Sequence, residues 1–241
     1  MTMSTELVGM GQKSGIEAAA RWSEELRRVS PFEVLRWAIQ HFGADLGLAS
    51  SFGGVSGMVL LDMAVKINPN IRVFYVDTDF LFPETYQTRD KAMHRYGITP
   101  LGYRPKLTPE EQAAQYGDRL WERDPDLCCA LRKVEPNKRA VEGLGAWIAG
   151  LRQDQSAMRS HVQPVMWDAK FGLYKICPLW NWTEEQVWEY IGKERVAVNP
   201  LHVEGYPSIG CTHCTRRVAD GEDLRAGRWS GVEKTECGLH K

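Results

Sequence analysis

The chain has 241 residues, enough for one well-filled domain with appendages. The chain has 30 Lys and Arg and 31 Asp and Glu, a formal net charge of -1. Its overall charge therefore does not attract nucleic acid or an anionic membrane, and an anionic ligand must be bound by local charge. No stretch approaches the roughly 20 apolar residues of a membrane span, and the N-terminus lacks a signal-peptide pattern. We therefore expect a cytoplasmic protein without nucleic-acid or membrane partners, whose six cysteines are ligands, catalysts or core residues rather than disulfides.

Residues 1–43 are expected to form N-terminal helices. Apolar residues at helical spacing among charges predict an amphipathic helix over 16–28. A second helix should begin at Ser30-Pro31, because Ser30 and Glu33 have capping-box spacing, and should end at Gly43.

Residues 44–210 are expected to form an α/β core. A strand over 46–50, a helix over 58–67 and a strand over 71–76 make a βαβ unit with a parallel sheet. A polar helix over 83–96, a strand over 98–103 and a helix capped by Thr108 follow. Further strands are predicted over 146–151 and 173–177, and then a helix capped by Thr183. Cys177, among apolar neighbours, is interpreted as a core residue.

The loop over 50–57 connects the first strand to its helix and is rich in small residues. Its glycines would let backbone N–H groups approach a phosphate beside the positive end of the helix, and its serines would add donors. An ordinary flexible connection is the alternative. The loop matches neither Walker A nor the dinucleotide-binding pattern. Asp77 and Asp79, after the next strand, could bind magnesium or cap a helix, and we favour capping.

The most informative feature is two pairs of cysteines: Cys128 and Cys129 are adjacent, and Cys211 and Cys214 have Cys-x-x-Cys spacing. Such pairs can hold zinc, form disulfides or carry an iron–sulfur cluster. Adjacent helical side chains diverge by about 100°, which suits the separate corners of a cluster better than a single zinc ion. A 4Fe-4S cluster is thus favoured, with zinc and unliganded or paired thiols left open.

Cations follow both pairs. Lys133 lies four residues after Cys129 and so shares its helical face. Arg152 follows a predicted strand and could clamp a phosphate or simply lie at the surface. After Cys214 come four arginines and several glycines, which indicate either a lid that orders over an anion or a solvated tail within residues 211–241. Cys237 could reach the phosphate loop from there, since 23 residues extend up to roughly 75 Å.

Six blocks of residues, in order along the chain, resemble the assimilatory sulfonucleotide reductases, specifically the cluster-containing adenylyl-sulfate reductase branch of that family. They are Ser50-Ser51-Phe52-Gly53-Gly54, Cys128-Cys129-Ala130-Leu131-Arg132-Lys133, Gly150-Leu151-Arg152-Gln153-Asp154-Gln155-Ser156, Cys211-Thr212-His213-Cys214-Thr215-Arg216, the segment 221–229, and Glu236-Cys237-Gly238-Leu239-His240. The resemblance extends over nearly the whole chain from about residue 30.

The resemblance implies an adenine nucleotide alpha hydrolase-like fold of the PP-loop type, with a mostly parallel sheet, helices on both faces and a mobile C-terminal tail. It also implies reduction of adenylyl sulfate to sulfite and AMP, with thioredoxin or a glutaredoxin-like protein as reductant and Cys237 as the nucleophile that carries the S-sulfonate. A 4Fe-4S cluster would be held by Cys128, Cys129, Cys211 and Cys214. The substrate would be bound by Ser50, Ser51, Gly53, Gly54, Lys133, Arg152, Arg225, Arg228 and His240.

One departure from the family concerns the phosphate loop. Val55-Ser56-Gly57 stands where many members carry Ala-Glu-Asp, so reduction of the 3′-phosphorylated nucleotide, or of both nucleotides, is the alternative within the family. A tRNA-thiolating transferase would need a Ser-Gly-Gly-x-Asp-Ser loop and a basic RNA surface, which the chain lacks. A cluster-bearing redox sensor is the non-enzymatic alternative. Self-association is left open.

Overall fold

The computed structural model describes residues 2–231, 234 and 236–240, with side chains from residue 12 onward. The chain forms two compact units that are interleaved in sequence. Unit 1 contains residues 1–49, 59–72 and 143–196, and unit 2 contains residues 50–58, 73–142 and 197–241. None of the helices in the described part of the chain is long and apolar enough to cross a bilayer.

Unit 1 is built on four strands in the order β1-β4-β6-β5. β1 (Leu46–Ala49) pairs in parallel with β4 (Ala146–Ile148), and β4 pairs in parallel with β6 (Leu173–Ile176). β5 (Val165–Asp168) is antiparallel to β6. All of the predicted strands in this unit are present, although β1, β4 and β6 end earlier than expected; β5 was not predicted.

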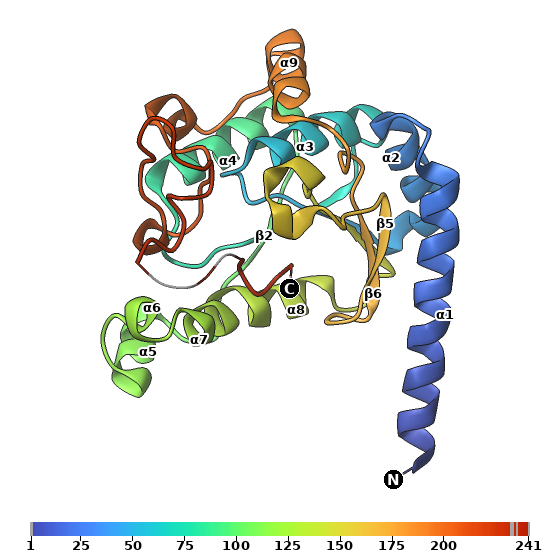
Figure 1. Cartoon of the computed structure of the whole chain (residues 1–241), viewed down its shortest axis with the longest axis horizontal. Helices are drawn as coiled ribbons and strands as arrows, with labels where there is room; N and C mark the ends of the chain where they lie inside the picture. The colour runs from blue at the N-terminus through green and yellow to red at the C-terminus, as the bar shows by residue number, and fades with distance from the viewer. Residues whose placement is uncertain (1, 232–233, 235, 241) are drawn as a thin grey trace. The chain divides into compact units, whose positions relative to one another are not determined.

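Helices cover this sheet. α1 (Thr2–Leu26) is longer than predicted and runs along β5 (Figure 1), where the Ser23 hydroxyl donates a hydrogen bond of 2.6 Å to the Val165 carbonyl. α2 (Pro31–Phe42) begins with the predicted Ser30 capping box and ends at Gly43. The short helices η1 (Gly43–Asp45), η3 (Gln153–Gln155) and η4 (Ala157–Arg159) lie in the connections, and α9 (Glu184–Glu194) has the predicted Thr183 cap.

Unit 2 contains the remaining two strands, β2 (Arg72–Val76), whose first residue belongs to unit 1, and β3 (Leu101–Tyr103). They pair in parallel through Phe74 and Leu101. α3 (Val55–Ile67) begins in this unit, three residues before its predicted start, and continues in unit 1. Its buried side chains confirm a buried helix. α4 (Pro83–Tyr96) has the predicted bounds, and α5 (Pro109–Tyr116) the predicted Thr108 capping box.

The rest of unit 2 is a series of short helices. α6 (Leu120–Arg123), α7 (Pro125–Cys129), the π-helical turn η2 (Ala130–Val134) and α8 (Glu135–Val141) follow one another, and η5 (Pro200–Glu204) and η6 (Thr212–Cys214) precede the C-terminal tail. Six strands with mostly parallel pairings and alternating helices confirm the predicted α/β class.

Candidate functional site

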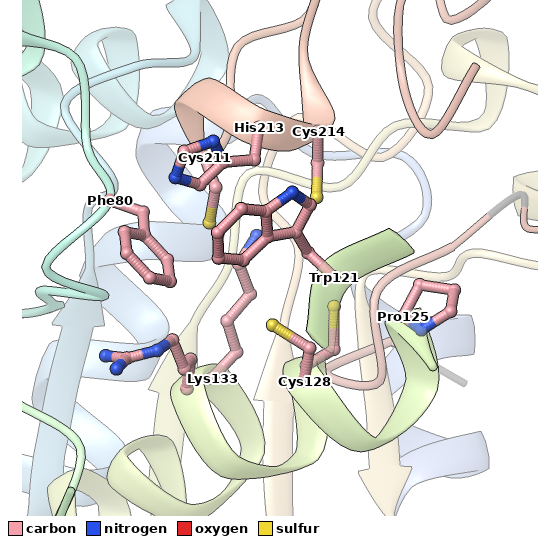
Figure 2. A pocket seen from close by; sticks show the side chains of 10 residues that line it. Phe80, Trp121, Pro125, Cys128, Lys133, Cys211, His213 and Cys214 are labelled. Carbon is pink, nitrogen blue, oxygen red and sulfur yellow. The ribbon is translucent and has the colours of Figure 1, made fainter. Parts of the chain in front are cut away.

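The two cysteine pairs line one pocket in unit 2, together with Phe80, Trp121, Pro125, Arg132, Lys133 and His213. Cys128 and Cys129 end α7, whose first turn is capped by the Asp124 carboxylate, which accepts a hydrogen bond of 2.9 Å from the Leu127 N–H. Figure 2 shows the Cys211 and Cys214 thiols directed toward the helix that carries Cys128. Segments more than eighty residues apart in the sequence therefore meet at four sulfur atoms.

The second cysteine pair is anchored to the segment that follows β2. The Thr212 N–H donates to the Phe80 carbonyl at 2.8 Å, and Leu81 and Cys211 form an isolated antiparallel bridge. Thr78 Oγ1 and Cys211 Sγ share a hydrogen bond of 3.3 Å. A polar group that touches a sulfur ligand in this way orients it and tunes its basicity.

All six cysteines are free thiols. Burial raises the pKa of Cys128 to about 12 and that of Cys214 to about 11, and the neighbouring thiols act in the same direction. The thiolate forms of Cys128 and Cys214 are therefore disfavoured unless positive charge is supplied nearby, as a coordinating metal does. Within the described residues, no three His, Cys, Asp or Glu side chains are placed to hold a single metal ion.

Buried N–H donors around the cysteines test whether an iron–sulfur cluster fits. Arg132 Nε and Nη2 and Trp229 Nε1 are buried and have no hydrogen-bond partner among the described residues. Arg132 lines the pocket. The backbone N–H of Trp229, as distinct from its indole N–H, donates a hydrogen bond of 3.2 Å to the Cys214 carbonyl. A buried donor without an acceptor costs about 1–3 kcal/mol. Four thiols and the two unpaired Arg132 donors of the same pocket fit a sulfur-rich anionic group, as an iron–sulfur cluster with thiolate ligands is.

A π-helical turn follows the adjacent cysteines, with the Glu135 N–H bonded to the Ala130 carbonyl. Lys133 lies in this wide turn, and its side chain extends toward the Cys211 segment (Figure 2). Burial disfavours its charged form, but Coulombic attraction by Cys211, Cys237 and Cys129 outweighs burial, and the pKa of Lys133 is raised. Lys133 is thus a cation held beside both cysteine pairs and beside the terminal cysteine.

The C-terminal tail lies against the cysteine helix. Lys234 Nζ donates to the Pro125 carbonyl at 2.9 Å and lies 2.6 Å from Asp126 Oδ1, and a Cβ on Gly238 would approach the Val134 side chain at 2.8 Å. The tail therefore contacts the start of α7 and the end of η2, and Cys237 is half-buried near Lys133. The His240 N–H bonds the Cys237 carbonyl.

Two of the four tail arginines, Arg225 and Arg228, are held by different partners. The Arg225 guanidinium forms an ion pair with Glu236 at 3.3 Å. Arg228 Nε donates to the Cys214 carbonyl at 3.2 Å, and its guanidinium lies 4.4 Å from the centre of the Trp229 ring. Arg228 is also close enough to Lys133 to oppose protonation of that lysine. The structure thus brings Arg228, Lys133 and Cys237 together at the edge of the cysteine pocket.

The predicted anion loop, residues 50–57, is held by hydrogen bonds to other residues of unit 2. The Ser50 N–H bonds the Phe74 carbonyl at 3.0 Å, and the Gly53 carbonyl is 2.9 Å from His202 Nε2. The Gly53 N–H donates to Ser51 Oγ at 3.4 Å, whereas the buried Ser50 hydroxyl has no partner among the described residues. Gly54 immediately precedes α3. The loop therefore offers a free hydroxyl next to a helix N-terminus.

Arg152 lies in unit 1 and is almost fully buried. Its guanidinium is bound by the carboxylates of Asp154 and Glu184. Cys177 is fully buried in the same unit, as predicted, and burial raises the pKa of its thiol to about 12.

The two aspartates after β2 neither cap a helix nor form a metal site in the described structure. Asp77 accepts a hydrogen bond from the Tyr86 hydroxyl at 2.7 Å, and Asp79 pairs with Arg132 at 3.2 Å. α4 begins after Phe82 without a side-chain cap. The preference for capping was therefore wrong, because Asp77 binds the Asp79 N–H and the Tyr86 hydroxyl, and Asp79 binds Arg132, in place of the N–H groups of the α4 N-terminus.

Several residues of the pocket were not assigned a role from the sequence. Trp121 and His213 stack at 3.9 Å over one side of the pocket, and Phe80 packs against both rings. The sequence analysis also gave no role to Thr78 or to the side-chain donors of Arg132. Their only signal was proximity in sequence to Cys128 or Cys211, or to the end of a strand.

Comparison with known proteins adds to this geometry. The profile of the phosphoadenosine phosphosulfate reductase domain matches residues 47–217, well over half of the chain. The chain belongs to this reductase family. Among curated family members, adenosine 5′-phosphosulfate reductase from Halalkalibacterium halodurans is 49% identical over 91% of this chain and 95% of its own length. Adenosine 5′-phosphosulfate reductase 2 from Bacillus subtilis is 48% identical over 88% of this chain and 90% of its own.

Two solved structures have a fold similar to that of this chain. The phosphoadenylyl-sulfate reductase of Candida auris, in a phosphate complex, is 38% identical with a TM-score of 0.74, covering 83% of this chain and 97% of that one. FMN adenylyltransferase of Candida glabrata has a TM-score of 0.54 at 13% identity, covering 87% of this chain and 75% of that chain, which shows likeness of fold alone.

Proposed function

We propose that this chain reduces adenylyl sulfate to sulfite and AMP in assimilatory sulfate reduction, with Cys237 as nucleophile and thioredoxin or a glutaredoxin-like dithiol protein as reductant. The observation that carries the proposal is the position of Cys237 beside Lys133 and the cysteine pocket. The names of the curated relatives support adenylyl sulfate as substrate. A thiol reductant implies a reducing compartment, and we place the protein in the cytoplasm.

The first half-reaction joins the Cys237 thiolate to the sulfate sulfur. The bond between that sulfur and the bridging oxygen of AMP breaks, AMP leaves with the electron pair, and Cys237 becomes an S-sulfocysteine. The substrate and the thiolate are both anionic, so cations at the site must offset their repulsion. We assign this role to Lys133 and Arg228, because the charges of both Cys237 and Arg228 act on Lys133.

The second half-reaction needs a dithiol, because both electrons come from thiols. One thiolate of the reductant attacks Cys237 Sγ and releases sulfite, and its second thiol breaks the mixed disulfide and frees Cys237. Cys177 is fully buried, and the other four cysteines line the pocket. In this proposal the four pocket cysteines are cluster ligands and Cys177 is buried, so we assign resolution of the intermediate to an external dithiol protein such as thioredoxin.

Cys128, Cys129, Cys211 and Cys214 would hold a 4Fe-4S cluster, which when bound supplies fixed charge and electrostatic tuning near the sulfate. Lys133 would lie between this group and the substrate. Ser50, Ser51, Gly53, Gly54, Arg152, Arg225 and His240 are proposed to contact the nucleotide or its phosphosulfate. For Arg225 this requires exchange of its Glu236 partner for the substrate.

The test is mass spectrometry of the anaerobic protein after mixing with adenylyl sulfate in the absence of thioredoxin. We expect a sulfonate on the peptide that contains Cys237, and its loss as sulfite when thioredoxin is added. Cys237→Ser should form no adduct and release no sulfite, while Cys177→Ala, the matched control at a buried thiol, should behave as the parent. An adduct on another cysteine, or sulfite release by Cys237→Ser, would contradict the proposal.

A second candidate substrate is the 3′-phosphorylated nucleotide, favoured by the likeness to the Candida auris phosphoadenylyl-sulfate reductase. Val55 and Ser56 are buried at the start of α3, and no acidic side chain stands at positions 55–57 to repel an additional phosphate. Comparison of kcat/KM on the two nucleotides decides between them. We expect adenylyl sulfate to be preferred.

A further inference from the structure

Lys234 is a buried cation that the proposed reaction does not use. Its side chain is 2% exposed, and its Nζ donates to the Pro125 carbonyl at 2.9 Å and lies 2.6 Å from Asp126 Oδ1. The ammonium also lies 5.8 Å from the centre of the Trp229 ring. A buried ammonium is costly unless it is paired, so these contacts decide where the chain around Lys234 lies.

The contacts of Lys234 join the tail to both cysteine segments. Pro125 and Asp126 begin α7, the helix of the adjacent cysteines. Trp229 donates a hydrogen bond from its backbone N–H to the Cys214 carbonyl. One tail side chain therefore contacts residues tied to each pair of pocket thiols.

Beyond Lys234, the tail follows the same helical segment. The charge of Cys237 acts on Lys133, and a Cβ on Gly238 would approach the Val134 side chain at 2.8 Å. The first and last contact points are eight residues apart on the helical segment, a rise of about 12 Å. On the tail they are four residues apart, a reach of up to about 14 Å. The tail thus runs alongside the segment in the same direction, and the Lys234 contacts set which helical residues Cys237 meets.

The ion pair between Lys234 and Asp126 is asymmetric in its burial. The lysine side chain is 2% exposed, whereas the aspartate side chain is 71% exposed. When the tail lifts, the ammonium enters water and the carboxylate stays in water, so neither charge is left buried and unpaired. When the tail stays closed without the carboxylate, the ammonium is buried with less compensation, and the closed position is disfavoured.

The two half-reactions of the proposed function place opposite demands on the tail. Sulfonation needs Cys237 beside Lys133, whereas a dithiol protein must bring its own sulfur into line with Cys237 Sγ, which is half-buried in the described structure. Resting on the proposed function, we propose that Lys234 and Asp126 are positioning residues. Their ion pair latches the tail closed for sulfonation of Cys237, and its opening presents the S-sulfocysteine to the reductant.

Asp126→Asn tests this latch, because it removes the charge and keeps the size of the side chain. In a single turnover without reductant, followed by mass spectrometry of the Cys237 peptide, we expect sulfonation to be roughly 10-fold slower, since a hydrogen bond to a charged group is weakened. When the sulfonated protein is isolated and mixed with thioredoxin, sulfite release should be at least as fast as in the parent. A residue with only a structural role would slow both steps.

Lys234→Met is the second variant, because it removes the cation from the tail and leaves the sequence of α7 unchanged. It should give the same split between the two half-reactions. Asp118→Asn is the matched control, which removes the same charge from the neighbouring helical region. Asp118 is exposed and binds Arg123 through its backbone carbonyl, so this variant should keep both parental rates.

Hydrogen exchange in the substrate-free protein measures the latch apart from the reaction. Exchange in residues 236–240, followed by mass spectrometry, should be faster in Asp126→Asn and Lys234→Met than in the parent and in Asp118→Asn. Parental exchange and parental sulfonation rates in both latch variants, or slowing of both half-reactions, would overturn the proposal. If the parent itself formed no Cys237 adduct, the proposed reaction would fail, while the exchange rates would still decide whether the latch exists.

Discussion

At the scale of single residues, Gly210 leaves room for one of the tail arginines. A Cβ at this position would overlap the guanidinium of Arg228, which bonds the Cys214 carbonyl. Gly210→Ala should therefore displace Arg228 from the edge of the cysteine pocket. Because a misplaced group about 1 Å from its productive position can cost up to roughly 100-fold in rate, we expect kcat/KM for adenylyl sulfate to fall roughly 10- to 100-fold, measured by steady-state sulfite release.

Gly192→Ala is the control for this substitution. A Cβ at Gly192, in α9, meets open space, and alanine there should raise helix stability by up to about 1 kcal/mol. Gly192→Ala should leave kcat/KM unchanged. If Gly210→Ala also kept the parent value, Arg228 would not be needed in its present position.

At the scale of elements, the segment from Arg216 to Ser230 carries Arg225 and is closed by one exposed ion pair. Arg216 binds Glu222 through two hydrogen bonds of 2.8 and 2.9 Å, and the Ala219 N–H adds a third of 2.7 Å. The Arg216 bonds, followed by that of Ala219, lower the pKa of Glu222 from 4.5 to about 2. A depressed carboxyl pKa stabilises the folded segment above pH 4.5, and this contribution is lost as the pH falls toward 2.

An NMR titration of the Glu222 carboxyl carbon measures this directly. We expect a midpoint near 2 in the parent and a clear upward shift in Arg216→Gln. Arg217→Gln is the matched control, because Arg217 packs on Gly205 rather than on Glu222. An unshifted midpoint in Arg216→Gln would show that the ion pair does not form in solution.

At the scale of the whole molecule, all four pocket cysteines belong to unit 2. A metal group that binds only the native site stabilises the region that holds it, and its removal should lower protection there. When the iron of the proposed cluster is removed by a chelator under anaerobic conditions, hydrogen exchange should increase in residues 125–134 and 208–215. Strands β4 and β6 of unit 1 should keep their protection, as followed by mass spectrometry. Cys128→Ser should reproduce the pattern, and equal loss in both units would contradict it.

Local features of the structure could be predicted from the sequence. The caps at Ser30, Thr108 and Thr183 are confirmed, because each depends on hydrogen bonds between residues three positions apart. The two cysteine pairs and the charged tail were also evident, since spacing and residue type are properties of the chain itself. The α/β class followed from the order of strands and helices.

Tertiary structure alone decided the features that depend on distant partners. β5 was missed because it is stabilised by pairing with β6 and by packing against α1. Asp79 turned out to bind Arg132, 53 positions away, and Lys234 to bind Asp126, 108 positions away. A carboxylate or an ammonium carries no mark of its partner in the linear sequence. Burial and the folded backbone select the partner, because an unpaired charge inside the protein is too costly to persist.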